Sequence, residues 1–134
     1  MIRTTSSRSH VAILAVWVVG FLIGTTSHII DLVAGGTETY AAFHVGLRVF
    51  WISLTVLDPL TAALLIMRRR AGIVLALAVI LADIAVNWTV YLMIAGNPLF
   101  GVVNQTLFAI ILLTTTPTLW RWFRPETRPY TERV

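Results

Sequence analysis

Five residues between His44 and Asp58 recur at helical spacing and form the clearest chemical signal in the chain. They are His44, Arg48, Trp51, Thr55 and Asp58, separated by four, three, four and three positions. At 100° per residue, these side chains fall within an arc of roughly 80° on one helix face. A stripe that carries an imidazole, a guanidinium and a carboxylate indicates a functional site, although it names no substrate.

The segment that carries this stripe, about residues 40–67, is otherwise apolar enough to lie in a bilayer. A charged side chain inside a membrane helix costs several kcal/mol unless it faces protein or water. We therefore expect the stripe to face neighbouring helices of a bundle rather than lipid.

The composition indicates an integral membrane protein of one domain. Of the 134 residues, 57% are hydrophobic and only 12% are charged, with a mean hydropathy of +0.84. The charged fraction is about half the soluble norm of roughly 25%. The chain has no cysteine, which excludes disulfides, thiolate metal sites and a cysteine nucleophile.

The apolar runs divide the chain into four predicted spans, at about 11–34, 40–67, 72–95 and 99–120. A polar segment, residues 1–10, precedes them and a basic tail, residues 121–134, follows. The first run is longer than the ~7–15 apolar residues of a signal peptide and lacks a typical cleavage site, so we interpret it as a retained anchor. The breaks are 35–39, the three arginines 68–70, and Gly96-Asn97-Pro98.

The arginines predict the orientation of these spans. All ten basic residues are arginines, and nine lie in the N-terminal segment, the 68–70 loop or the tail. This distribution is typical of membrane topology, so a nucleic-acid partner is rejected despite the net charge of +4. The positive-inside rule places both termini in the cytoplasm, and we expect the plasma membrane. Short connections then predict an all-α, antiparallel up-down-up-down four-helix transmembrane bundle.

Depth estimates bring polar residues of all four spans together. At 1.5 Å per residue, Asp58 lies about 15 Å and Asp83 about 20 Å from the cytoplasmic edge. These depths predict a polar pocket between the helices that reaches the midplane and opens outward. The candidate ligand-binding residues are His28, Asp31, His44, Arg48, Trp51, Asp58, Asp83, Asn87, Tyr91, Asn104 and Gln105.

Some of these residues have purely structural alternatives. Arg48 could extend to the outer interface, Asp58 could repair a kink at Pro59, and Asn104 and Gln105 could serve only as inter-helix hydrogen-bonding groups. Asp83 is hardest to explain structurally, because a carboxylate near the midplane is costly. Two such acids should share a proton or be neutralised by arginine. If the side chains of Asp58 and Asp83 face one another, at least one should be protonated at neutral pH.

The turn at residues 35–39 predicts a second polar group, in the outer leaflet. Residues equidistant from a short turn lie level on antiparallel helices. His28 and Asp31 should therefore meet His44 and Arg48, with Asp31 as the counter-charge of Arg48.

The pocket predicts binding or transport of a small apolar or cationic molecule, with Asp58 and Asp83 supplying charge and Trp51, Trp88 and Tyr91 forming walls. The alternatives are a membrane-embedded proton-shuttling isomerase, using His28 or His44 beside Asp83, and a structural or accessory subunit of a membrane complex. Haem binding by His28 and His44 is a weaker hypothesis. No catalytic residue is assigned, and no cofactor or metal site is predicted.

The expected partners are the lipid bilayer and a second copy or a larger complex. Gly20 and Gly24 form a small-xxx-small pair that lets a neighbouring helix approach closely, and they support the second contact.

The layout is broadly similar to small four-helix membrane families. Four spans with intramembrane acids, and Asn87 beside Trp88, are similar to the sterol-isomerase-like emopamil-binding proteins. Small multidrug exporters share the four-span layout but place their key carboxylate as Glu in the first span, where this chain has none. The chain is assigned to neither family.

Overall fold

A computed structural model describes residues 3–94 and 99–123, which form four long helices and one short 3-10 turn. These are α1 (Arg3–Gly35), η1 (Gly36–Glu38), α2 (Val45–Ile66), α3 (Arg70–Ile94) and α4 (Leu99–Trp122). Each α-helix is long and apolar enough to cross a membrane, and the described residues contain no strand. The predicted all-helical fold with four apolar helices is confirmed. The predicted break at 96–98 and the tail beyond 123 lie outside the described residues.

The second helix begins later than the sequence predicted. Residues 36–44 form η1 and tight turns, and His44 is the N-cap of α2, where its Nδ1 accepts a hydrogen bond from the Gly46 N–H at 3.2 Å. Tyr40 and Phe43 extend the apolar pattern, but they pack against Trp51 from the connection rather than from the helix. The stripe identified in the sequence therefore begins with a helix cap.

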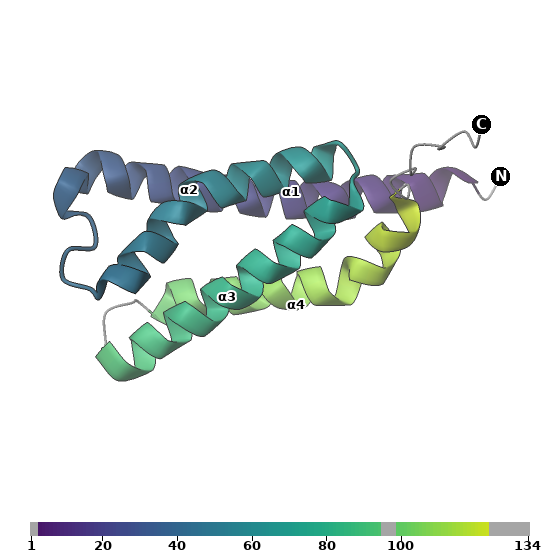
Figure 1. Cartoon of the computed structure of the whole chain (residues 1–134). Coiled ribbons are helices and arrows are strands. Elements are labelled where there is room, and N and C mark those ends of the chain that lie inside the picture. The colour runs from purple at the N-terminus through teal and green to yellow at the C-terminus, as the bar shows by residue number, and fades with distance from the viewer. Residues whose placement is uncertain (1–2, 95–98, 124–134) are drawn as a thin grey trace, which may run out of the picture.

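Consecutive helices pack against one another, and α1 also contacts α4 along a seam that is the least extensive of the helix contacts. In Figure 1 the start of α1 and the end of α4 lie at one end of the molecule, and the connection between α1 and α2 lies at the other. The long helices run along the length of the bundle, so one helix can contribute residues to the interior near either end.

The interior near the start of α1 is closely filled with apolar side chains. Trp17, Leu65, Ile73, Leu112 and Leu119 have no exposed surface, and Phe123 is 1% exposed. The Trp17 indole N–H donates to the Thr115 hydroxyl at 2.9 Å, which joins α1 to α4. We call this region, defined by those six buried residues, the packed half.

The arginine turn between α2 and α3 lies against the end of α4. The Arg68 guanidinium is 4.2 Å from the centre of the Trp122 ring, and the Arg70 guanidinium is 4.9 Å from that of Trp120. Cation–π contacts of this kind hold the basic turn and the aromatic end of α4 together. The arginines and the packed half thus share one end of the molecule.

Candidate functional site

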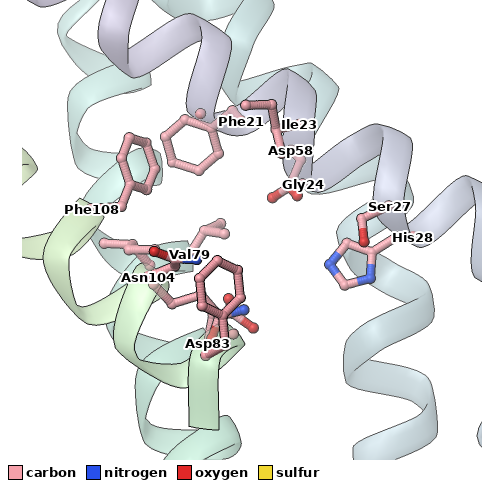
Figure 2. Close-up of a pocket in the computed structure, with 15 residues that line it drawn as sticks. Phe21, Ile23, Gly24, Ser27, His28, Asp58, Val79, Asp83, Asn104 and Phe108 are labelled. Atoms are coloured by element: carbon pink, nitrogen blue, oxygen red, sulfur yellow. The ribbon is translucent and has the colours of Figure 1, made fainter. Parts of the chain in front are cut away.

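A cavity of about 540 Å³ lies between the helices, in the half of the bundle away from the arginine turn (Figure 2). All four helices line it. The lining residues are Gly20, Phe21, Ile23, Gly24, Ser27 and His28 of α1, Asp58 of α2, Val79, Ile80 and Asp83 of α3, and Phe100, Gly101, Asn104, Gln105 and Phe108 of α4. We call the region around it the cavity half.

The cavity has a buried floor and an exposed rim. Its lining residues from α2 and α3 are all buried. By contrast, Ile23 of α1 is 65% exposed and Phe100 of α4 is 80% exposed. The rim therefore follows the seam between α1 and α4, where the helices contact each other least.

Asp58 points into the cavity from the floor and is only 5% exposed. Gly24 of α1 lies opposite it, because a Cβ atom built on Gly24 would be 2.6 Å from Asp58 Oδ2. The absence of a side chain at Gly24 makes room for the carboxylate. No hydrogen bond joins Asp58 to any other described residue, so its side chain does not repair the backbone near Pro59.

Asp83 lines the cavity from α3, across from Asp58, and is 7% exposed (Figure 2). Its Oδ1 accepts a hydrogen bond of 2.6 Å from the amide of Asn87, one turn further along α3. Asp58 and Asp83, which the depth estimate placed at similar levels, thus line the same cavity.

Polar groups from α1 and α4 complete the cavity. His28 Nδ1 and Gln105 Oε1 are buried and have no hydrogen-bond partner. Asn104 also lines the cavity but is exposed at its rim. These three side chains, unlike the two acids, lie on the helices that meet at the seam.

The aromatic walls differ from those that the sequence predicted. Phe21 and Phe108 lie edge to face with ring centres 5.6 Å apart, and a Cβ atom on Gly20 would overlap the Phe108 ring. Sequence reasoning missed these phenylalanines. The helical spacing of Phe21 with His28, and of Phe100 and Phe108 with Asn104, is the signal that could have found them.

The predicted walls lie elsewhere. Trp51 packs between Tyr40 and Phe43, with ring centres 4.9 Å and 5.0 Å away. The Trp88 indole N–H donates to the Thr106 hydroxyl at 2.9 Å, and the Tyr91 ring lies 5.8 Å from the Trp88 ring. Trp88 thus joins α3 to α4 beside the cavity, and the described lining includes none of the three predicted wall residues.

The predicted Arg48–Asp31 ion pair is wrong. The Arg48 guanidinium donates to the backbone carbonyl of Thr37, and the Asp31 carboxylate accepts a hydrogen bond of 2.6 Å from the Tyr40 hydroxyl. The connection at residues 36–44 folds back between the two helices and supplies both partners. Burial, together with the hydrogen bond to Asp31, raises the pKa of Tyr40 above its usual value, so its hydroxyl stays a donor at neutral pH.

The predicted outer cluster is accordingly divided. His28 lines the cavity, whereas Asp31, His44 and Arg48 belong to the connection and its flanking helix ends. His44 is not among the described residues that line the cavity with His28, and haem binding by this pair stays a prediction. Among the described residues, no group of three or more His, Asp or Glu side chains could hold a metal ion.

Gly20 and Gly24 face α4 and α2 of the same chain, and a contact between copies through them stays a prediction. Comparisons with protein-family models, with curated proteins and with solved structures find no match for this chain. The functional conclusion therefore depends on the chemistry of the cavity.

Proposed function

We propose that this chain is an integral membrane protein whose cavity binds or transports a small organic cation with an apolar body. One observation carries the proposal: Asp58 and Asp83 are buried together in the cavity floor, and no arginine is among the described residues that line it. The chain has no lysine, so no described basic side chain other than His28 reaches the site.

The free-energy cost of burying the two carboxylates explains why the cavity should favour a cation. A buried carboxylate without a counter-charge is expensive, and two close together cannot both ionise at low cost. In the empty site we expect at least one of the two acids to be protonated, because burying both charges is costly. A cation that enters compensates their charge and releases that proton, which is the minimal device for coupled exchange.

The walls suit the apolar part of such a ligand. Phe21 and Phe108 offer ring faces and edges, and aromatic faces attract cations. The volume of about 540 Å³ lies within the roughly 300–1,000 Å³ of small-molecule sites. A one- or two-ring amine has the size and polarity that this cavity can enclose.

The membrane setting belongs to the same proposal. The four long apolar helices, their exposed apolar side chains and the clustering of nine of the ten arginines in the N-terminal segment, the 68–70 turn and the tail of the sequence support an antiparallel up-down-up-down transmembrane bundle in the plasma membrane, with both termini cytoplasmic. Because the chain lacks cysteine, single cysteines at Thr37 and Arg69 test the orientation without background labelling. Position 37 should react with an impermeant thiol reagent on intact cells. Reaction of position 69 under the same conditions would contradict the orientation.

The cation site is tested by calorimetry on the protein in lipid nanodiscs. The probe is 2-(1-naphthyl)ethylammonium, and its neutral alcohol analogue, 2-(1-naphthyl)ethanol, controls for apolar binding. Asp58→Asn and Asp83→Asn should each weaken binding of the ammonium about tenfold, or about 1.4 kcal/mol, and leave the alcohol unchanged.

Asp31→Asn is the matched control, because it makes the same change on an acid outside the cavity and keeps an acceptor for Tyr40. If both cavity variants bind the ammonium as the unmodified chain does, the proposed function is wrong.

A further inference from the structure

The cavity contains hydrogen-bonding groups that the chain itself leaves unused. Gln105 Oε1 and His28 Nδ1 are buried without a partner. Asp58, 5% exposed, also lines the cavity, whereas Asp83 already accepts a hydrogen bond from Asn87. Buried polar groups in folded proteins are nearly always paired, so two unpaired atoms beside a buried carboxylate need an explanation.

All three groups, the Asp58 carboxylate, Gln105 Oε1 and His28 Nδ1, are able to accept hydrogen bonds. A carboxylate and an amide oxygen can only accept, and Nδ1 of a neutral histidine accepts when the proton is on Nε2. They come from α2, α4 and α1, respectively, and surround the same space. Figure 2 shows Asp58 and His28 on different sides of that space, with Asp83 opposite Asp58. An occupant of the cavity is therefore in a position to donate to more than one of them.

We infer that the site selects cations that carry N–H donors, namely protonated primary or secondary amines, over quaternary ammonium ions of the same shape. This inference rests on the proposed function. A primary ammonium group brings one positive charge and three N–H donors, enough for a carboxylate, an amide oxygen and an imidazole nitrogen. A quaternary ammonium brings the same charge to the acids and leaves Gln105 and His28 unpaired.

Charge alone cannot produce this preference. Two carboxylates and aromatic walls would attract both kinds of cation, since cation–π attraction does not need a donor. Sites built to hydrogen-bond an N–H group reject analogues that lack it, because their acceptors are then left buried and unpaired. The preference is therefore a property of the acceptors and separable from the acids.

The test compares 2-(1-naphthyl)ethylammonium with its N,N,N-trimethyl derivative, by calorimetry on the full chain in nanodiscs. The primary ammonium should bind at least about tenfold more tightly than the trimethyl derivative. Gln105→Leu, which removes one acceptor at similar volume, should reduce this ratio by weakening the primary ammonium alone. His28→Leu should act in the same direction and serves as a second variant if one of the two folds poorly.

Thr114→Val is the control, because Thr114 is exposed on α4 and its hydroxyl donates to the Ile110 carbonyl of its own helix. It should leave the ratio unchanged. Equal or tighter binding of the trimethyl derivative overturns the inference and leaves the cation site standing. A ratio that persists in both Gln105→Leu and His28→Leu attributes the preference to size and also overturns it. Binding of neither cation overturns the proposed function together with the inference.

Discussion

The two halves of this bundle are filled in opposite ways by the same four helices. In the packed half, large apolar side chains such as Trp17 and Leu65 leave no exposed surface. In the cavity half, three glycines and a series of polar groups line about 540 Å³ of unfilled space. The difference indicates that the packed half holds the four helices in place. The same helices can then enclose an acidic, incompletely filled interior in the cavity half.

In both halves, nevertheless, the same kind of hydrogen bond joins α4 to another helix. A tryptophan donates its indole N–H to a threonine of α4 in each: Trp17 to Thr115 in the packed half, and Trp88 to Thr106 beside the cavity, both at 2.9 Å. Each threonine also donates to a carbonyl of its own helix one turn back. The last helix is thus bound to α1 and to α3 by matched contacts, and the comparison between halves can be made with matched substitutions.

The largest expected difference is in the free energy of unfolding after removal of a large aromatic side chain. Trp17→Ala should cost about 3–5 kcal/mol, because it empties a fully packed site and removes a hydrogen bond. Phe108→Ala should cost less than half as much, since one side of that ring already faces the cavity. Denaturant titration followed by far-ultraviolet circular dichroism measures both. Equal losses would show that the two halves are packed alike.

A smaller change should affect binding more than stability. Gly24→Ala places a Cβ atom 2.6 Å from Asp58 Oδ2, so the carboxylate must move. We expect the affinity for the naphthyl ammonium probe to fall about tenfold, or about 1.4 kcal/mol, with a minor change in unfolding. Gly46→Ala is the control, because within 4 Å its Cβ would meet only the His44 ring, with Nδ1 at 3.4 Å. If Gly24→Ala and Gly46→Ala changed the affinity equally, the space at Gly24 would not be important for binding.

The sequence predicts the structure well where a segment or residue differs in polarity from its neighbours in the chain. Long apolar runs located the four helices, and polar residues isolated in those runs, such as Asp58, Asp83 and Gln105, do line one cavity. The prediction failed where everything is apolar. Phe21 and Phe108 have the same apolar character as lipid-facing residues, so only their helical spacing from His28 and Asn104 distinguishes them.

The connection before α2 failed for a different reason. Tyr40 and Phe43 continue the apolar pattern of the helix, so nothing local marked its start except the capping side chain of His44. That misplacement put Arg48 opposite Asp31, whereas the folded connection provides the Thr37 carbonyl and the Tyr40 hydroxyl instead. Backbone partners of this kind carry no sequence signal.

The smallest expected effect compares the two indole hydrogen bonds. Thr115→Val should cost about 1–2 kcal/mol of unfolding free energy, because the Trp17 indole is fully buried and would be left without an acceptor. Thr106→Val should cost about 0.5–1 kcal/mol, since Trp88 is only partly buried. The same denaturant titration resolves the difference. A larger loss for Thr106→Val would place the stabilising attachment of α4 beside the cavity.

The seam between α1 and α4 has a consequence for how the molecule is made. The floor acids are on α2 and α3, and both are synthesised before the helix that carries Asn104, Gln105 and Phe108. If the chain spans a bilayer as proposed, α1, α2 and α3 inserted before α4 would hold Asp58 and Asp83 with one side open to lipid, where buried charge is least tolerated. Insertion of α4 would replace that lipid with amides and aromatic rings and would complete the proposed binding site.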